Sequence, residues 1–86
     1  MSIINNIAKL KKLDRLIRFG ITGSPNDLAE KMEVSRATIF RTIERLKTEF
    51  DAPIYFDKSI NSYYYEVPGQ LILRFVAKEE EDVANG

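Results

Sequence analysis

The hydrophobic pattern of the first fifty residues has the period of an α-helix in three separate stretches. In the first stretch, apolar residues recur at spacings of three and four and predict a helix over residues 3–19: Ile3, Ile7, Leu10, Leu13 and Ile17. The second set is shorter and predicts a helix that begins at residue 25: Leu28, Ala29 and Met32. The third set falls within about 60° on a helical projection, which predicts a helix over Ser35–Glu49 with one buried stripe: Ile39, Ile43, Leu46 and Phe50.

Local signals mark where these helices begin and end. Ser24-Pro25-Asn26-Asp27 is a capping box with proline at the first helical position, and Ser35 occupies the N-cap position of the third helix. The short stretch Glu33-Val34-Ser35 leaves room only for a tight turn between the second and third helices. Ala29 is small enough to let those two helices cross closely. The sequence therefore predicts a helix-turn-helix.

The pattern changes to that of β-strands after residue 52. Ile54-Tyr55-Phe56 reads as one strand, residues 57–62 as a turn, and Tyr63 to Val67 as the returning strand of a hairpin. Alternation along that second strand predicts that Tyr63 and Tyr65 face the helices while Tyr64 points away. The predicted fold class is α+β: three helices with a small antiparallel hairpin.

The end of the chain has two further features. Residues 70–76 are β-prone and apolar on both faces, which predicts an extra strand that either packs on the domain or pairs with a second copy. Residues 78–86 are acidic and carry little to bury, so we expect a disordered tail after a domain of residues 1–77.

The third helix carries its polar residues opposite its buried stripe. Ala37, Arg41, Arg45 and Thr48 point outward on the helical projection. Arginine, small and hydroxyl side chains suit the major groove of DNA, where arginine pairs with guanine and small groups meet thymine methyls. Phe40 lies to the side of the stripe, where it either packs on the first helix, the interpretation we favour, or meets a thymine methyl. A solvated basic face is the alternative for the helix as a whole.

The sequence LAEKMEVSRATIFRTIERL, followed by APIYFDKSINSYYYEV, resembles the winged-helix domains of the biotin-repressor and deoxyribose-operon-repressor type, a group called helix-turn-helix type 11. The resemblance runs from about Leu10 to Val67. It implies a winged helix that binds double-stranded DNA, mostly in bacterial transcription regulators. With the outward face, it gives these candidate DNA contacts, of which Arg41 and Arg45 are the strongest: Ser35, Arg36, Ala37, Thr38, Arg41, Thr42 and Arg45 on the third helix. The wing is expected to add little affinity, with Lys58, Asn61 and Ser62 as weak backbone contacts.

Composition narrows the function classes. The chain has 86 residues and neither histidine nor cysteine, so the usual general base, the thiolate nucleophile and the commonest metal ligands are missing. An enzyme is the weakest hypothesis, and we expect no catalytic residue, metal, cofactor or small-molecule ligand. No membrane segment or signal peptide is recognisable, which favours the cytoplasm.

Net charge leaves two functions open. The formal charge is zero, but four of the thirteen acids lie together at residues 79–82, and residues 1–50 contain ten cations and six acids. A DNA-binding regulator is the favoured function, and we expect a homodimer through the first helix or the C-terminal strand. A winged-helix module that binds protein is the alternative, with Ile3, Ile4 and Ile7 expected outside the core and available to a partner.

Overall fold

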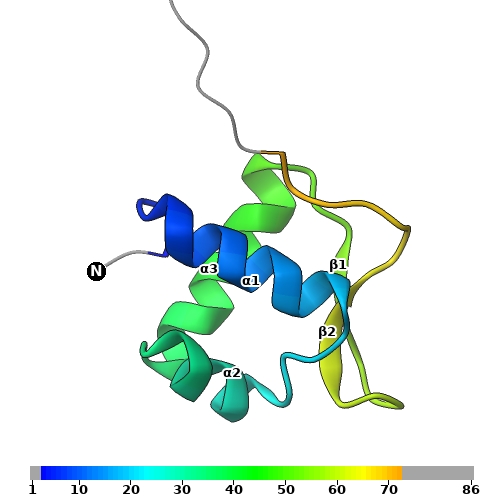
Figure 1. The fold of residues 1–86 in the computed structure, drawn as a ribbon, viewed down its shortest axis with the longest axis horizontal. Coiled ribbons are helices and arrows are strands. Elements are labelled where there is room, and N and C mark those ends of the chain that lie inside the picture. The colour runs from blue at the N-terminus through cyan, green and yellow to red at the C-terminus, as the bar shows by residue number, and fades with distance from the viewer. Residues whose placement is uncertain (1–2, 73–86) are drawn as a thin grey trace, which may run out of the picture.

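The computed structural model describes residues 3–72 of the chain. Three helices precede a two-stranded antiparallel sheet: α1 (Ile7–Arg18), α2 (Pro25–Met32), α3 (Arg36–Glu49), β1 (Ile54–Asp57) and β2 (Ser62–Tyr65). Figure 1 shows α1 crossing in front of α3, with α2 at one end of α3 and the hairpin beside the helices. This is the predicted α+β winged helix-turn-helix.

Side-chain caps fix the start of each helix. The Ser24 hydroxyl accepts from the amide of Asp27 at 3.1 Å, and the Asp27 carboxylate accepts from the amide of Ser24 at 3.1 Å, so the predicted capping box is confirmed. Those hydrogen bonds lower the pKa of Asp27.

Ser35 caps α3 by accepting from the amide of Thr38 at 3.1 Å. The turn between α2 and α3 is closed by Glu33 in the left-handed region, with φ of 57°.

Two apolar residues lie differently from what the periodicity predicted. The first helix begins only at Ile7, capped by the Asn6 side chain, and Ile3 precedes it in a turn yet is completely buried in the core. Our expectation that Ile3 lies outside the core was therefore wrong, whereas Ile7 is exposed as expected. Phe50 was predicted to continue the buried stripe of α3, but it follows the last helical residue and is 39% exposed. The departure from helical torsions at residue 50 carries its ring out of the stripe.

The hairpin is held to the helical part by buried hydrogen bonds. β1 and β2 pair antiparallel with Ile54 opposite Tyr65 and Asp57 opposite Ser62. The Ser62 hydroxyl accepts from the amide of Thr22 at 2.9 Å, and the Thr22 hydroxyl accepts from the amide of Tyr63 at 2.9 Å. The connection between α1 and α2 is thereby fastened to the start of β2.

The tyrosines of β2 alternate as predicted. Tyr63 and Tyr65 are buried in the core, while Tyr64 is exposed. The rings of Tyr63 and Phe56 meet edge to face, with 5.2 Å between their centroids, which is a favourable geometry for two aromatic rings. The two-residue period of the strand therefore predicted correctly which face of the hairpin packs on the core.

A buried carboxylate joins α1, β2 and the segment that follows β2. One oxygen of Asp14 accepts from the Tyr65 hydroxyl at 2.5 Å and from the backbone amide of Leu71 at 3.0 Å. Arg18 lies one turn further along α1, with its Nε 3.7 Å from the other Asp14 oxygen. Burial, and then the hydrogen bond to Asp14, raise the pKa of Tyr65 far above its ordinary value.

The predicted C-terminal strand is not seen where the structure describes it. Residues 70–72 have no regular secondary structure, although Leu71 packs against the core. Residues 73–76, the rest of that predicted strand, and the acidic tail 78–86 lie outside the described residues. Across residues 3–72, no helix has the length and apolar character that crossing a membrane requires.

Candidate nucleic-acid interface

One arc of α3 faces away from the core. The buried side of the helix is formed by Ile39, Thr42, Ile43 and Leu46, and the exposed side carries Arg36, Ala37, Phe40, Arg41, Glu44, Arg45 and Thr48. The first turn contains no acidic residue, so the positive end of the helix dipole and the charge of Arg36 both attract an anion. This end of α3 is electrostatically suited to an anion.

Three of the predicted contact residues form one hydrogen-bonded chain at the start of α3. The hydroxyls of Ser35 and Thr38 are 3.0 Å apart, and Arg41 Nη2 donates to the Thr38 hydroxyl at 3.2 Å. Arg41 itself is exposed, and this contact occupies only one nitrogen of its guanidinium. The remaining N–H groups are available to an acceptor presented from solvent.

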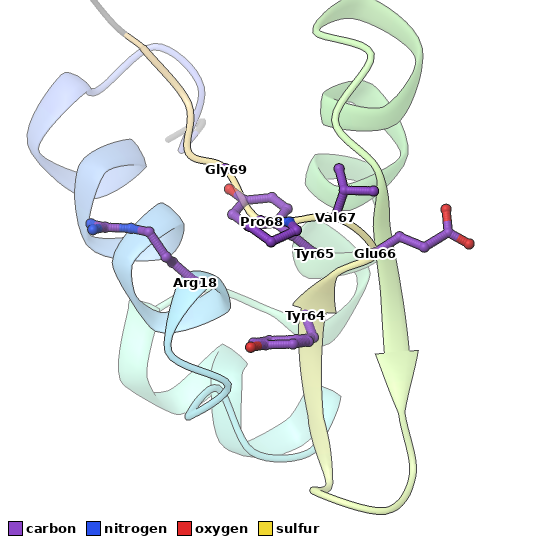
Figure 2. Close-up of a pocket in the computed structure, with 7 residues that line it drawn as sticks. All are labelled: Arg18, Tyr64, Tyr65, Glu66, Val67, Pro68 and Gly69. Carbon is purple, nitrogen blue, oxygen red and sulfur yellow. The ribbon is translucent and has the colours of Figure 1, made fainter.

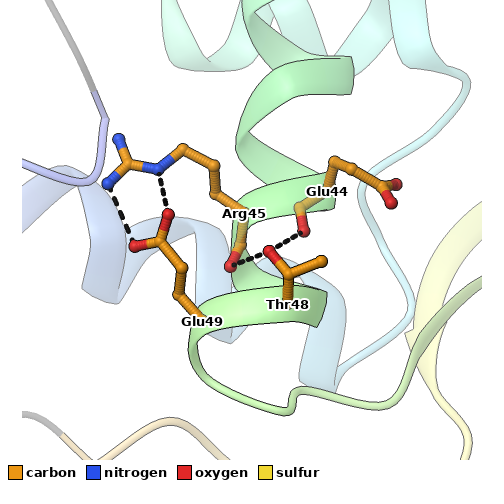
Figure 3. Close-up of polar contacts among 4 residues, drawn as sticks. All are labelled: Glu44, Arg45, Thr48 and Glu49. Atoms are coloured by element: carbon orange, nitrogen blue, oxygen red, sulfur yellow. Dashed lines mark hydrogen bonds and ion pairs between the residues drawn. The ribbon is translucent and has the colours of Figure 1, made fainter.

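Arg45 is exposed but already paired. Its Nε and Nη2 donate to the two carboxylate oxygens of Glu49 at 2.8 and 3.1 Å, a bidentate contact one turn along the helix (Figure 3). The hydrogen bonds raise the pKa of Arg45 and lower that of Glu49. Glu49 was not among the predicted site residues, although a spacing of four between an arginine and an acid is the sequence signal for such a pair.

Thr42 is a correction to the predicted set. Its side chain is only 4% exposed and lies among the core residues of α3, so it is not available to a ligand. Its position three residues after Ile39 and four before Leu46 places it on the buried stripe. The outward arc read from the sequence was too wide on this side.

Phe40, for which we favour packing on the first helix, is only partly covered. It is 45% exposed, and the guanidinium carbon of Arg36 lies 5.1 Å from the ring centroid. That distance is typical of a cation–π contact. Arg36 and Phe40 therefore form an exposed pair on the same arc as Ala37 and Arg41.

The wing supplies little positive charge. Lys58 is exposed and is the single cationic residue in the sequence from Ile54 to Tyr65. Its neighbour Asp57 is held ionised because the Ser59 hydroxyl and amide donate to it at 2.6 and 2.9 Å, which lowers the pKa of the carboxyl. Ser62, expected as a weak contact, is fully buried and bonded to Thr22, so that expectation was wrong. Asn61 is exposed and adopts φ of 51°.

A separate hollow lies between the end of α1 and the segment after β2. It has a volume of about 330 Å³ and is shown in Figure 2. Its lining residues are Arg18, Tyr64, Tyr65, Glu66, Val67, Pro68 and Gly69. Gly20 lies nearby, with its backbone against the side chains of Ile60 and Tyr64. Both of those side chains and Phe19 are exposed, so this part of the surface is apolar.

Comparisons with known proteins agree with the architecture. Residues 21–64, just over half of the chain, match the family model HTH_11, described as an HTH domain. Two curated relatives, from Escherichia coli and Serratia marcescens, are each described as "Probable tellurium resistance transcriptional regulator TerW". Each is 29% identical over 84 residues, which is 98% of this chain and 54% of the relative.

The chain thus spans about half the length of the curated relatives it matches. No solved structure matches it. The matched family is described as an HTH domain, and both relatives are described as probable transcriptional regulators. The helix-turn-helix of α2 and α3, the hairpin that follows it and the family match over both agree, and the chain belongs to the helix-turn-helix family HTH_11.

Proposed function

We propose that this chain is the DNA-binding part of a bacterial transcription regulator and that it inserts α3 into the major groove of double-stranded DNA. The observation that carries the proposal is the exposed arc of α3, where Arg36, Ala37 and Arg41 stand together at a capped helix start that has no acid in its first turn. An α-helix fits the major groove, and arginine donors match the acceptors on guanine.

The contact residues have different roles in this proposal. Arg41 reads base edges or binds phosphate, while Ser35, Arg36 and Thr38 lie near phosphates at the helix start. Ala37 allows close approach, and Lys58 adds a weak backbone contact from the wing. Arg45 contributes less than its charge implies because Glu49 neutralises it. A single module of this size binds weakly, so two copies on a palindromic site complete the proposal.

Selection of bound sequences from a random pool of duplex DNA tests the function directly. We expect enrichment of a defined motif, and binding that weakens as salt rises because phosphate contacts release counterions. Recovery of no motif, together with passage of the protein through heparin at low salt, would contradict the proposal.

Replacing Glu49 by glutamine is expected to strengthen binding of the selected duplex. The change removes a negative charge from α3 and frees the Arg45 guanidinium, which can then contact phosphate. We expect an affinity gain of several-fold at low salt, and a slope of log affinity against log salt that is steeper by about one. Fluorescence anisotropy across a salt series measures both quantities. Glu66→Gln, which removes an exposed acid outside α3, is the control; equal gains in the two variants would show that Arg45 has no specific part.

A protein-binding module is the second candidate. The exposed apolar side chains around Gly20, beside the hollow of Figure 2, favour it, as does the zero net charge. Retention on heparin or on random duplex at low salt distinguishes the two: the DNA-binding function requires retention, whereas a module that binds only protein passes through.

A further inference from the structure

The exposed ring of Phe40 is the feature of α3 that arginine–guanine recognition does not use. It lies on the solvent-facing arc of the helix, 45% exposed, in a position where α3 otherwise presents charged or small side chains. Single exposed apolar residues are common on protein surfaces and carry no meaning by themselves. For Phe40, the charged neighbours of the ring indicate a function.

Arg36 holds the ring in place. Its guanidinium carbon lies 5.1 Å from the ring centroid, so one face of the phenyl group is covered by a cation. Arg41 follows Phe40 in sequence and is also exposed. The ring thus has one cation on its face and a second cation at the next position of the helix. A purely apolar partner would leave these cations unpaired, whereas a polyanion with apolar groups at its surface satisfies both.

Double-stranded DNA has that combination in its major groove. Phosphates line the groove, and the methyl group of thymine is the apolar feature exposed on its floor. Glu44 lies one turn beyond Phe40 and is exposed. Its carboxylate suits the amino group of cytosine, which also faces the major groove. The charged neighbours of the ring on α3 are therefore compatible with a thymine beneath it.

We propose that Phe40 is a specificity-determining residue that recognises a thymine through the methyl group of the base. The inference rests on the proposed insertion of α3 into the major groove and adds the identity of one base. Arg36 acts as a positioning residue, because it orients the ring and places its own charge toward the adjacent phosphate.

The experiment uses the duplex recovered from the random pool, with each thymine replaced in turn by deoxyuridine. This change removes one methyl group and leaves base pairing unaltered. We expect one thymine in each half-site at which the replacement weakens binding by the wild-type chain about fourfold, the factor that corresponds to about 0.8 kcal/mol for one buried methyl-sized group. Phe40→Ala is expected to bind more weakly and to lose this sensitivity at the same position.

Phe19→Ala is the matched control. Phe19 is also an exposed phenylalanine, 61% accessible, with the guanidinium of Arg18 at 5.1 Å from its ring, but it follows α1 rather than lying on α3. This variant is expected to retain the full sensitivity to deoxyuridine. Circular dichroism establishes that each variant is folded. The deoxyuridine series measured with the wild-type chain tests the proposal without any protein variant.

The outcomes separate the inference from the function on which it rests. Tight binding of a selected duplex with no sensitivity to deoxyuridine at any position overturns the role of Phe40 and leaves DNA binding intact. Sensitivity that persists in Phe40→Ala also overturns it, because another residue then contacts the methyl group. Failure of every duplex to bind overturns the proposed function itself.

Discussion

Replacing Arg36 and Arg41 together by alanine is expected to weaken binding of the selected duplex roughly 100-fold. A good arginine contact to a base, proposed for Arg41, is worth about 1–3 kcal/mol, and the phosphate contact of Arg36 is lost with it. Both side chains are exposed on α3 and their removal takes nothing from the core. We therefore expect the thermal midpoint of unfolding to change little. Fluorescence anisotropy at fixed salt measures the affinity, and a salt series shows how many phosphate contacts are lost.

The matched control removes the same charge from another helix. Lys11 and Arg15 are exposed on α1, so Lys11→Ala with Arg15→Ala lowers the net charge equally without touching α3. We expect this control to lose far less affinity than the variant of α3. Equal losses in the two double variants would show that the chain attracts DNA by its overall field alone, and helix insertion would then have to be abandoned.

The sequence predicted the architecture because its local signals agree with one another. Each cap read from the sequence, at Ser24 and at Ser35, forms the expected hydrogen bonds, and the alternation of Tyr63, Tyr64 and Tyr65 gives the correct inner face of the hairpin. Such features depend on neighbours within a few residues, which the sequence displays directly.

The corrections involve contacts that depend on residues distant in sequence. Ile3 is buried although it lies outside α1, because the turn before the helix folds it onto the core. Ser62 is buried because it bonds to Thr22, forty residues earlier. A period of 3.6 or of 2 contains no information on such partners, so burial at these positions was not predictable from local pattern.

The candidate site was predictable to the level of the helix face and no further. Arg41 lies on the arc that the helical projection assigned to it, whereas Thr42, its neighbour, proved to be buried. The pairing of Arg45 with Glu49 also required geometry, because an exposed arginine can adopt many rotamers of which only some reach the acid. Which base each side chain contacts depends on the sequence of the bound DNA as well as on the chain, so the protein sequence alone could not predict it.

Replacing Asp14 by alanine is expected to lower the free energy of unfolding by about 2–5 kcal/mol, a large part of the 5–15 kcal/mol typical of a small domain. Asp14 is 6% exposed, and its loss leaves the Tyr65 hydroxyl and the Leu71 amide without their acceptor. Urea titration followed by circular dichroism measures the change. Asp14→Asn, which keeps an acceptor oxygen, should lose less, and the exposed Glu30→Ala should stay within about 0.5 kcal/mol of the wild type.

The same hydrogen bond gives the stability of the domain a dependence on alkaline pH. Burial and Asp14 raise the pKa of Tyr65 in the folded chain, so the folded state keeps the phenolic proton at pH values where the unfolded chain, with a pKa of about 10, releases it. The contribution of Tyr65 is therefore complete below about pH 10 and is lost as the pH rises further, by up to about 1.4 kcal/mol per pH unit.

Tyr65→Phe isolates this effect, because the other tyrosines and the lysines titrate in both proteins. We expect the stability advantage of the wild type over Tyr65→Phe to be constant from pH 7 to about pH 9 and to shrink above about pH 10. Curves that stay parallel through pH 11 would mean that Tyr65 loses its proton equally readily in both states. In that case the hydrogen bond from Tyr65 adds little, and the cost of Asp14→Ala comes from the burial of Asp14 and from the Leu71 amide that loses its acceptor.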